Sequence, residues 1–366
     1  MNVRNHGIQA AARRNRRRIA TVITAVIALA SLSACASDEP DTVTPPDTVT
    51  PPATDEEITL TVYSGRNENL VGEVYARFTE ATGINVDARY GKTAELAALI
   101  AEEGANSPAD LFYAQDAGAL GALELAGRLT ALPGDLIDIV ESPFRSRTDA
   151  WVGVNGRARV IAYNHTLVDS ADVPTSIFEL TDPKWKGQVA WSSQNASFQA
   201  FVTALRVTEG DDVAREWLEG MIANDVVDFE NNSGLLDGIA RGEALLGITN
   251  HYYLYRTLTE DPDYPVSNQY LPGDIGGLVN IAGVGVLRDS ANQAAALELA
   301  RFLLSDEIQT WFATETDAPE YPLRDGVEAS PRLPSLESIN PPDVDLTKIA
   351  DLQGTLDMLR DVGALG

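Results

Sequence analysis

The chain has 366 residues, of which 44% are hydrophobic and 22% are charged, and its 54 acidic residues outnumber 27 basic ones for a net charge of −27. This composition is typical of a folded protein of about two domains and excludes a chain that is disordered throughout. The negative charge argues against nucleic acid or an anionic membrane surface as a partner of the folded body. The single cysteine, Cys35, excludes a disulfide framework and a cysteine-based metal cluster.

The first 34 residues have the pattern of a signal peptide. Arginines without any acidic residue precede an apolar run at 19–34, whose 16 residues fall short of the roughly 20 that span a bilayer. The sequence Leu-Ser-Ala-Cys at 32–35 is similar to the bacterial lipobox, which implies that Cys35 is lipidated and becomes the mature N-terminus. An ordinary secretory signal is the alternative. We expect an exported protein anchored to the outer face of the cell membrane.

A Thr/Pro-rich spacer follows the cysteine. The sequence Asp-Thr-Val-Thr-Pro-Pro at 41–46 is repeated without change at 47–52. Such a stretch has too few apolar residues to bury and favours extended conformations. We therefore predict a linker over 35–57 and a folded body that begins near Ile58.

Strands and helices alternate through the first part of the body. Alternating apolar residues predict a strand at 58–63, and apolar residues at helical spacing predict a helix that ends near Gly83. Further strands are expected at 84–89 and 110–114, with helices at 93–103 and 117–129. This order favours an α/β fold with a largely parallel sheet.

A second series of the same kind follows. Strands are expected at 187–192 and 244–249, and helices at 197–209, 211–221, 234–241 and from Tyr252 onward. Two β-rich, Gly-punctuated runs, 152–163 and 278–287, fit neither series and are the predicted crossovers between two lobes. A helix at 292–304 is expected to return to the first lobe.

Seven short motifs occur in an order that resembles the ferric-ion-binding proteins of ABC importers, also called bacterial transferrins. The motifs are LTVYSG at 60–65, ATGI at 81–84, SPADLFY at 107–113, GRARV at 156–160, PKWKG at 183–187, NHYY at 250–253 and EYPL at 320–323. This resemblance implies a type II periplasmic-binding-protein fold. The expected organisation is a first lobe at 58–155 plus 280–330, a second lobe at 156–279, and a C-terminal helical segment at 331–366 that packs on both.

Tyr252 and Tyr253 are the candidate metal ligands. Fe(III) is a hard, highly charged ion, and a phenolate is a hard anionic oxygen donor that must first lose a proton with a pKa near 10. Adjacent side chains diverge on a regular strand or helix, so both phenols can meet one ion only at the irregular strand–helix junction predicted here. An ordinary aromatic pair, with one ring in the core and one exposed, is the alternative.

The resemblance also implies an anion, such as phosphate, carbonate or citrate, held with the iron on the second lobe. The matching positions are Asn195, Ala196, Ser197, Asn232 and Asn250. Helix N-termini bind anions through free N–H groups. Plain N-capping by Asn195 and Asn232 is the competing interpretation.

The first lobe departs from the family. Asn67 and Gln115 stand where many members carry histidine and glutamate, so neutral amides replace two stronger ligands. Asp116 or Tyr90 could substitute, an exogenous anion or water could fill the positions, or the solute could be something other than iron. Arg66 could pair with a bound anion, but the expected role is that of an exposed surface residue. His165 and His251 are expected to be structural.

The expected function is that of a solute-binding lipoprotein, not an enzyme, that delivers ferric iron to an ABC permease. It is expected to be monomeric, to bind no nucleic acid, and to contact the membrane only through its lipid. The alternatives are a binding protein of the same fold for an anion or small organic solute, and an exported enzyme. The sequence contains no Gly-x-Ser-x-Gly, HExxH or P-loop motif, which argues against the enzyme.

Overall fold

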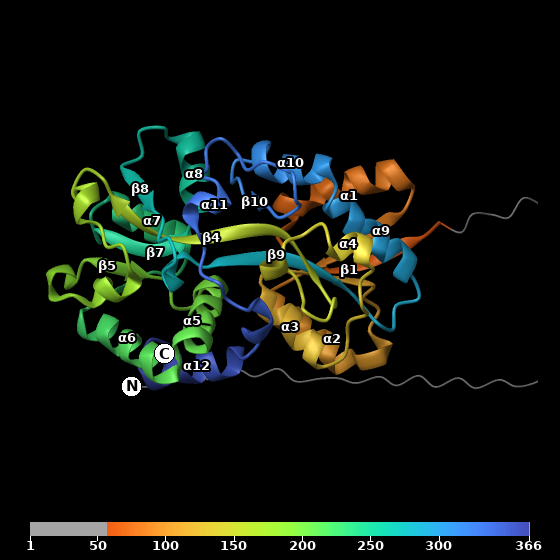
Figure 1. Ribbon diagram of the computed structural model, residues 1–366, viewed down its shortest axis with the longest axis horizontal. Helices are drawn as coiled ribbons and strands as arrows, with labels where there is room; N and C mark the ends of the chain where they lie inside the picture. Colours follow the sequence, from red (N-terminus) through yellow and green to blue (C-terminus); the bar gives the residue numbers. More distant parts are fainter. Residues whose placement is uncertain (1–56, 366) are drawn as a thin grey trace, which may run out of the picture. The chain divides into compact units, whose positions relative to one another are not determined.

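A computed structural model describes residues 57–365 of the chain. The predicted signal peptide, Cys35 and the Thr/Pro repeats lie outside these residues. Ten strands form one hydrogen-bonded sheet in the order β2-β1-β3-β9-β4-β7-β5-β6, with β8 and β10 also paired to β4. Helices cover the sheet, and Figure 1 shows the strands β4 and β9 running through the centre between two helix-flanked halves.

The first half is built from the predicted alternation. Its elements are β1 (Thr59–Ser64), α1 (Glu68–Thr82), β2 (Asn85–Tyr90), α2 (Thr93–Glu103), β3 (Leu111–Ala114), α3 (Ala117–Leu125) and the short α4 (Gly134–Ile137). The strand β1 pairs in parallel with both β2 and β3. The helix α3 ends earlier than the predicted residue 129, because Gly127 takes a left-handed φ of 64° that continues no right-handed helix.

The second half repeats this plan. Its elements are β5 (Val189–Trp191), α5 (Ala196–Glu209), α6 (Asp211–Ala223), β6 (Val227–Asp228), α7 (Asn232–Ala240), β7 (Leu246–Asn250), α8 (Tyr252–Glu260) and β8 (Val266–Gln269). The strand β5 pairs in parallel with β6 and β7. Its core is aromatic: Phe198 and Phe201 of α5 pack with Trp191 and Trp217 at centroid distances of 5.3 to 6.3 Å.

Two long strands join the halves. The strand β4 (Val152–Asn164) is buried at all 13 positions; its first part pairs with β9 (Val279–Val286) and its second part with β7 and β8. All of these pairings are antiparallel, as is that of β9 with β3. The largely parallel sheet predicted from the sequence is therefore found within each β-α series, whereas the crossover strands add antiparallel pairs.

The chain then returns to the first half. The helix α9 (Gln293–Leu303) follows β9, and its Phe302 packs on Phe78 of α1 at 5.4 Å. The helix α10 (Asp306–Thr314) precedes the two-residue strand β10 (Tyr321–Pro322), which pairs with β4 at Asn155 and Gly156. None of the helices in residues 57–365 combines the length and apolar character that a membrane span needs.

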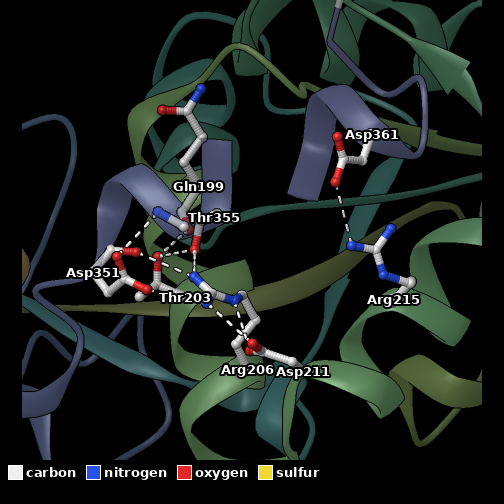
Figure 2. A network of polar contacts seen from close by, with 9 residues as sticks. Gln199, Thr203, Arg206, Asp211, Arg215, Asp351, Thr355 and Asp361 are labelled. Atoms are coloured by element: carbon white, nitrogen blue, oxygen red, sulfur yellow. Dashed lines mark hydrogen bonds and ion pairs between the residues drawn. The ribbon is translucent and has the colours of Figure 1, made fainter. Parts of the chain in front are cut away.

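The C-terminal segment touches both halves. After α11 (Leu336–Ile339), the turn at Leu346–Lys348 packs on α3, and α12 (Leu352–Asp361) packs on α5. Figure 2 shows the polar contacts of α12: Thr355 and Thr203 share a buried hydrogen bond of 2.8 Å, Arg206 bonds Asp351 and Asp211, and Arg215 pairs with Asp361. The C-terminal residues therefore link α3 to α5.

Candidate ligand site between the lobes

Tyr252 and Tyr253 lie at the junction where β7 ends and α8 begins. Only His251 separates the last strand residue, Asn250, from the first helical residue, Tyr252. The two rings stack with centroids 4.4 Å apart and an interplanar angle of 26°. Tyr252 is 8% exposed and Tyr253 is half-buried. The irregular junction thus brings the two aromatic rings together.

The phenol of Tyr252 is held in its protonated form. Burial raises its pKa well above the ordinary value, and the neighbouring Tyr253 raises it further, whereas the charge of Arg157 acts in the opposite direction. At neutral pH only a strong Lewis acid could displace this proton.

His251 packs against the ring of Tyr252 and is held in place by backbone groups. Its Nδ1 accepts a hydrogen bond from the Ala158 N–H at 3.2 Å, and its Nε2 lies 3.0 Å from the carbonyl oxygen of Pro319. Burial lowers the pKa of His251 to about 4, so the ring is neutral and donates from Nε2. It meets the Tyr252 ring edge-on at 5.9 Å. The predicted structural role of His251 is confirmed.

Three buried arginines lie near the tyrosines, and none of them is among the site residues predicted from the sequence. Arg66, Arg157 and Arg159 are each 2% exposed. The expectation that Arg66 is an exposed surface residue is wrong, because its Nη2 pairs with Glu320 at 2.9 Å in the interior. Burial works against the charge of Arg66, but Glu320 keeps its pKa above the ordinary value.

Arg157 and Arg159 have no carboxylate in salt-bridge contact among the described residues. Arg157 donates to the carbonyl oxygens of Gln115 and Ile281, and Arg159 donates to that of Ser197 at 2.9 Å while lying over the Phe201 ring at 4.9 Å. Nε and Nη1 of Arg157 and Nε of Arg159 have no hydrogen-bond partner within residues 57–365. Burial lowers the pKa of Arg159 to about 9.

These unpaired cations could have been found from the sequence. The motif GRAR places two arginines at alternate positions of a run expected to be a crossover strand, and alternate residues of a strand share one face. A buried charge without a partner is costly, because it loses its hydration without compensation. Arg157 and Arg159 therefore give the buried side of the site, its arginine floor, a positive charge that an anionic group could compensate.

The second-lobe candidates differ in what they do. The Asn195 side chain caps α5 by accepting from the Ser197 N–H at 2.9 Å and from its hydroxyl at 2.6 Å, so the capping interpretation is confirmed there. It is wrong for Asn232, because Asn231 caps α7. Asn232 is 1% exposed, and neither its amide oxygen nor its nitrogen has a partner in the described chain. Its donor is free to bind an anion.

Other unpartnered groups lie at the same edge of the second-lobe sheet. The hydroxyls of Ser192, just after β5, and Thr249, in β7, are buried without a hydrogen-bond partner among residues 57–365. Asn250 lies opposite Arg159 in the ladder of β7 and β4. Ala196 is exposed at the start of α5. The edge thus combines unused donors with the free side chain of Asn232.

The first-lobe candidates face a cavity of about 1120 Å³. Asn67, Tyr90, Gln115 and Asp116 line it together with the second-lobe residues Asn195 and Ala196, whereas Tyr252 and Tyr253 are not among its lining residues. Asp116 is already engaged, since its carboxylate caps α3 through the Ala119 N–H at 3.0 Å. Burial raises its pKa, which makes it a poor anionic ligand.

A conventional metal cluster is not found in the described part of the chain. No group of three His, Cys, Asp or Glu side chains gathers in a way that could hold an ion. The donors at the site are instead two phenols, neutral amides and arginine N–H groups.

Two α/β lobes joined by β4 and β9, with one cavity lined from both, define a type II extracytoplasmic solute-binding protein. The chain belongs to the bacterial extracellular solute-binding protein family, whose model matches residues 106–348.

Individual relatives have names that refer to iron. The chain is 34% identical to "Iron uptake protein A1" of Synechocystis sp. over 84% of this chain and 86% of that protein. It is 30% identical to the "Major ferric iron-binding protein" of Neisseria meningitidis serogroup B, over 85% and 95%. Among solved structures, iron-bound HitA from Pseudomonas aeruginosa matches with a TM-score of 0.77 and 31% identity, over 84% of this chain and 99% of that one.

A further structural relative is described with two ligands. Trichodesmium FutA, in complex with iron and citrate, matches with a TM-score of 0.72 and 28% identity over 83% of this chain and 99% of that chain.

Proposed function

We propose that this protein binds ferric iron with an exogenous anion outside the cytoplasm and delivers it to an ABC permease. The observation that carries the proposal is the stacked pair Tyr252 and Tyr253 near Arg157 and Arg159, two buried arginines without a carboxylate partner in residues 57–365. The iron-related names of its relatives support it. Lipidation of Cys35 would hold the protein at the membrane surface, where a permease operates.

The chemistry follows from the donors. Fe(III) withdraws the proton from each phenol, and the positive arginine floor lowers the cost of forming phenolate nearby. Phosphate, carbonate or citrate would complete the coordination from the second lobe. Its contacts would come from Asn195, Ala196, Ser197, Asn232 and Asn250. The neutral Asn67 and Gln115 of the first lobe can only assist, as can Asp116 and Tyr90.

Capture would involve closure of the lobes around the ligand. The proposed lobes are 58–155 plus 280–330 and 156–279, with 331–366 packed across them. The crossover strands β4 and β9 would bend as the lobes approach. The permease would then recognise the closed monomer, because only that form presents both lobes in one fixed arrangement.

The test is the colour of the loaded protein. Purified protein titrated with ferric citrate should develop the visible absorption of ferric tyrosinate. Tyr252→Phe and Tyr253→Phe should each weaken or shift the band, and the double variant should lose it. Tyr264→Phe is the matched control. The Tyr264 hydroxyl donates to the Asp237 carboxylate at 2.9 Å and does not belong to the stacked pair. A wild-type protein without the band, or a double variant that keeps it, would refute the proposal.

A further inference from the structure

The last part of the chain crosses from one lobe to the other. Residues 346–355, which we call the strap, comprise the turn Leu346–Lys348, the three residues after it and the start of α12. The turn packs on α3 of the first lobe, and α12 packs on α5 of the second lobe (Figure 1). Ile349 and Thr355 are both buried. The strap is therefore a further connection between the lobes besides β4 and β9.

The strap meets the first lobe at two glycines of α3. Gly118 and Gly121 lie one helical turn apart. A Cβ atom on Gly118 would lie 2.7 Å from the carbonyl oxygen of Ile349, and one on Gly121 would lie 3.1 Å from that of Thr347. Glycine is unfavourable inside a helix because it loses more backbone freedom on folding than other residues. What these two positions provide in return is the close approach of the strap backbone to α3.

The contact with the second lobe is polar instead. The hydroxyls of Thr355 and Thr203 share a buried hydrogen bond of 2.8 Å, and Arg206 of α5 donates to Thr355 at 2.9 Å and pairs with Asp351 at 3.1 Å (Figure 2). Breaking a buried hydrogen bond leaves a polar group unsatisfied, whereas a backbone packed on glycines can move away without that cost. The strap is thus held on the second lobe, and its contact with α3 is the one expected to open.

The strap has little slack between these two contacts. Ile349 lies on α3 and Asp351 bonds Arg206 of α5, so the contacts are only two residues apart. Two residues span about 7 Å at most when fully extended. Ile349, Ala350 and Leu352 also line the cavity between the lobes. On this side of the cavity, α3 and α5 therefore cannot move far apart while both contacts are kept.

We propose that the strap holds the lobes together on this side, and that they separate there only when its contact with Gly118 and Gly121 opens. The two glycines then set the balance between a close and a separated arrangement of α3 and α5. Side chains at these positions favour the separated arrangement, because they push the strap backbone off the helix. The proposal goes beyond the proposed function, since it does not depend on which solute is bound.

The test measures the distance between the lobes in the unliganded protein. With Cys35→Ser removing the only native cysteine, Leu125→Cys at the end of α3 and Val213→Cys on α6 supply two exposed sites for spin labels. Double electron–electron resonance then reports the distribution of distances. Gly118→Ala/Gly121→Ala should raise the population at longer distance about fivefold or more, because a side chain forced into a close-packed contact disfavours that contact.

Gly72→Ala is the matched control. It makes the same change inside α1 of the same lobe, where the nearest atom to the new Cβ is a side-chain carbon of Glu68 at an ordinary 3.4 Å. This variant should keep the wild-type distance distribution. Lengthening by Gly72→Ala equal to that of the double variant would overturn the proposal, because the strap would then not be its cause.

The single variants keep the test decisive if the double variant does not fold. The three heavy atoms nearest to a Cβ on Gly121 all belong to the strap, so Gly121→Ala acts on this contact directly. Gly118→Ala should lengthen the distance more, because its Cβ would lie closer to the strap. Wild-type distances in both single variants would overturn the proposal. These measurements need no iron, so that result would leave the proposed function intact, and a missing tyrosinate band would not affect the strap.

Discussion

Two equally buried arginines of this site differ in the cost of their buried charge, because that cost depends on their partners. Arg66 and Arg159 are equally buried, but Arg66 has Glu320 as a partner at 2.9 Å, whereas Arg159 has only uncharged oxygens and aromatic rings among the described residues. Removing one member of a buried ion pair strands the other charge. Removing an unpaired buried charge relieves a cost that the empty protein carries.

This difference predicts opposite responses to the same substitution. Arg66→Met should destabilise the unliganded protein by about 3–5 kcal/mol, because Glu320 is left buried and unpaired. Arg159→Met should change its stability by about 1 kcal/mol or less, yet weaken ferric citrate binding about tenfold or more. Urea unfolding measures the stability, and titration with ferric citrate followed by visible absorption measures the binding. Equal destabilisation by both substitutions would contradict this assignment of charge.

The sequence singled out the two tyrosines, but it did not place Arg66 or predict the free side chain of Asn232. Tyr252 and Tyr253 stood out because two phenols follow a strand directly. Arg66 could not be placed, since its partner Glu320 lies 254 positions away and only the sheet pairing of β10 with β4 brings it near. The free side chain of Asn232 depends on Asn231 taking the cap, a choice between identical neighbours that no pattern decides.

At the scale of elements, α12 is attached to the second lobe by charge as well as by packing. Asp351 caps the helix through the Gly354 N–H at 3.0 Å and pairs with Arg206 at 3.1 Å. The Gly354 N–H and then Arg206 hold the pKa of Asp351 below its ordinary value of 3.8. A carboxyl with a lowered pKa in the folded state stabilises that state above pH 3.8, and this contribution is lost as the pH falls further.

Acid should therefore loosen α12. Between pH 5 and pH 3 the wild-type Tm should fall more than that of Asp351→Asn, whose amide can still cap the helix but does not titrate. The difference should be about 2 °C or less, because the carboxylate is largely exposed and such pairs are weak. Thermal unfolding followed by circular dichroism at both pH values measures it. An equal fall in the two proteins would show that the Asp351 charge contributes nothing.

Local pattern predicted elements better than it predicted their ends and partners. The helix at 93–103 matches the predicted range, since capping and periodicity are local properties. The strand at 187–192 shrinks to Val189–Trp191, because its length is set by pairing with β6 and β7. The position of β9 between β3 and β4 is a long-range property, and the sequence offered only the expectation of a crossover.

At the scale of the whole molecule, closure is the event to measure. Ferric citrate should lower the radius of gyration of the wild-type protein in solution X-ray scattering, because the lobes approach around the ligand. The double variant Tyr252→Phe/Tyr253→Phe, which lacks both phenolates, should stay at the unliganded radius. An unchanged radius in iron-loaded, coloured wild-type protein would mean that binding occurs without closure.

The strand β4 belongs to both lobes and also carries Arg157 and Arg159 on one of its faces. Inserting or deleting a single residue before this motif would turn both guanidinium groups to the opposite side of the sheet and shift the pairing with β9 at the same time. An insertion or deletion in β4 would therefore change the connection between the lobes and the positions of the two arginines together. Changes in ligand preference that keep this strand in register are therefore expected as substitutions of single side chains rather than as insertions or deletions in β4.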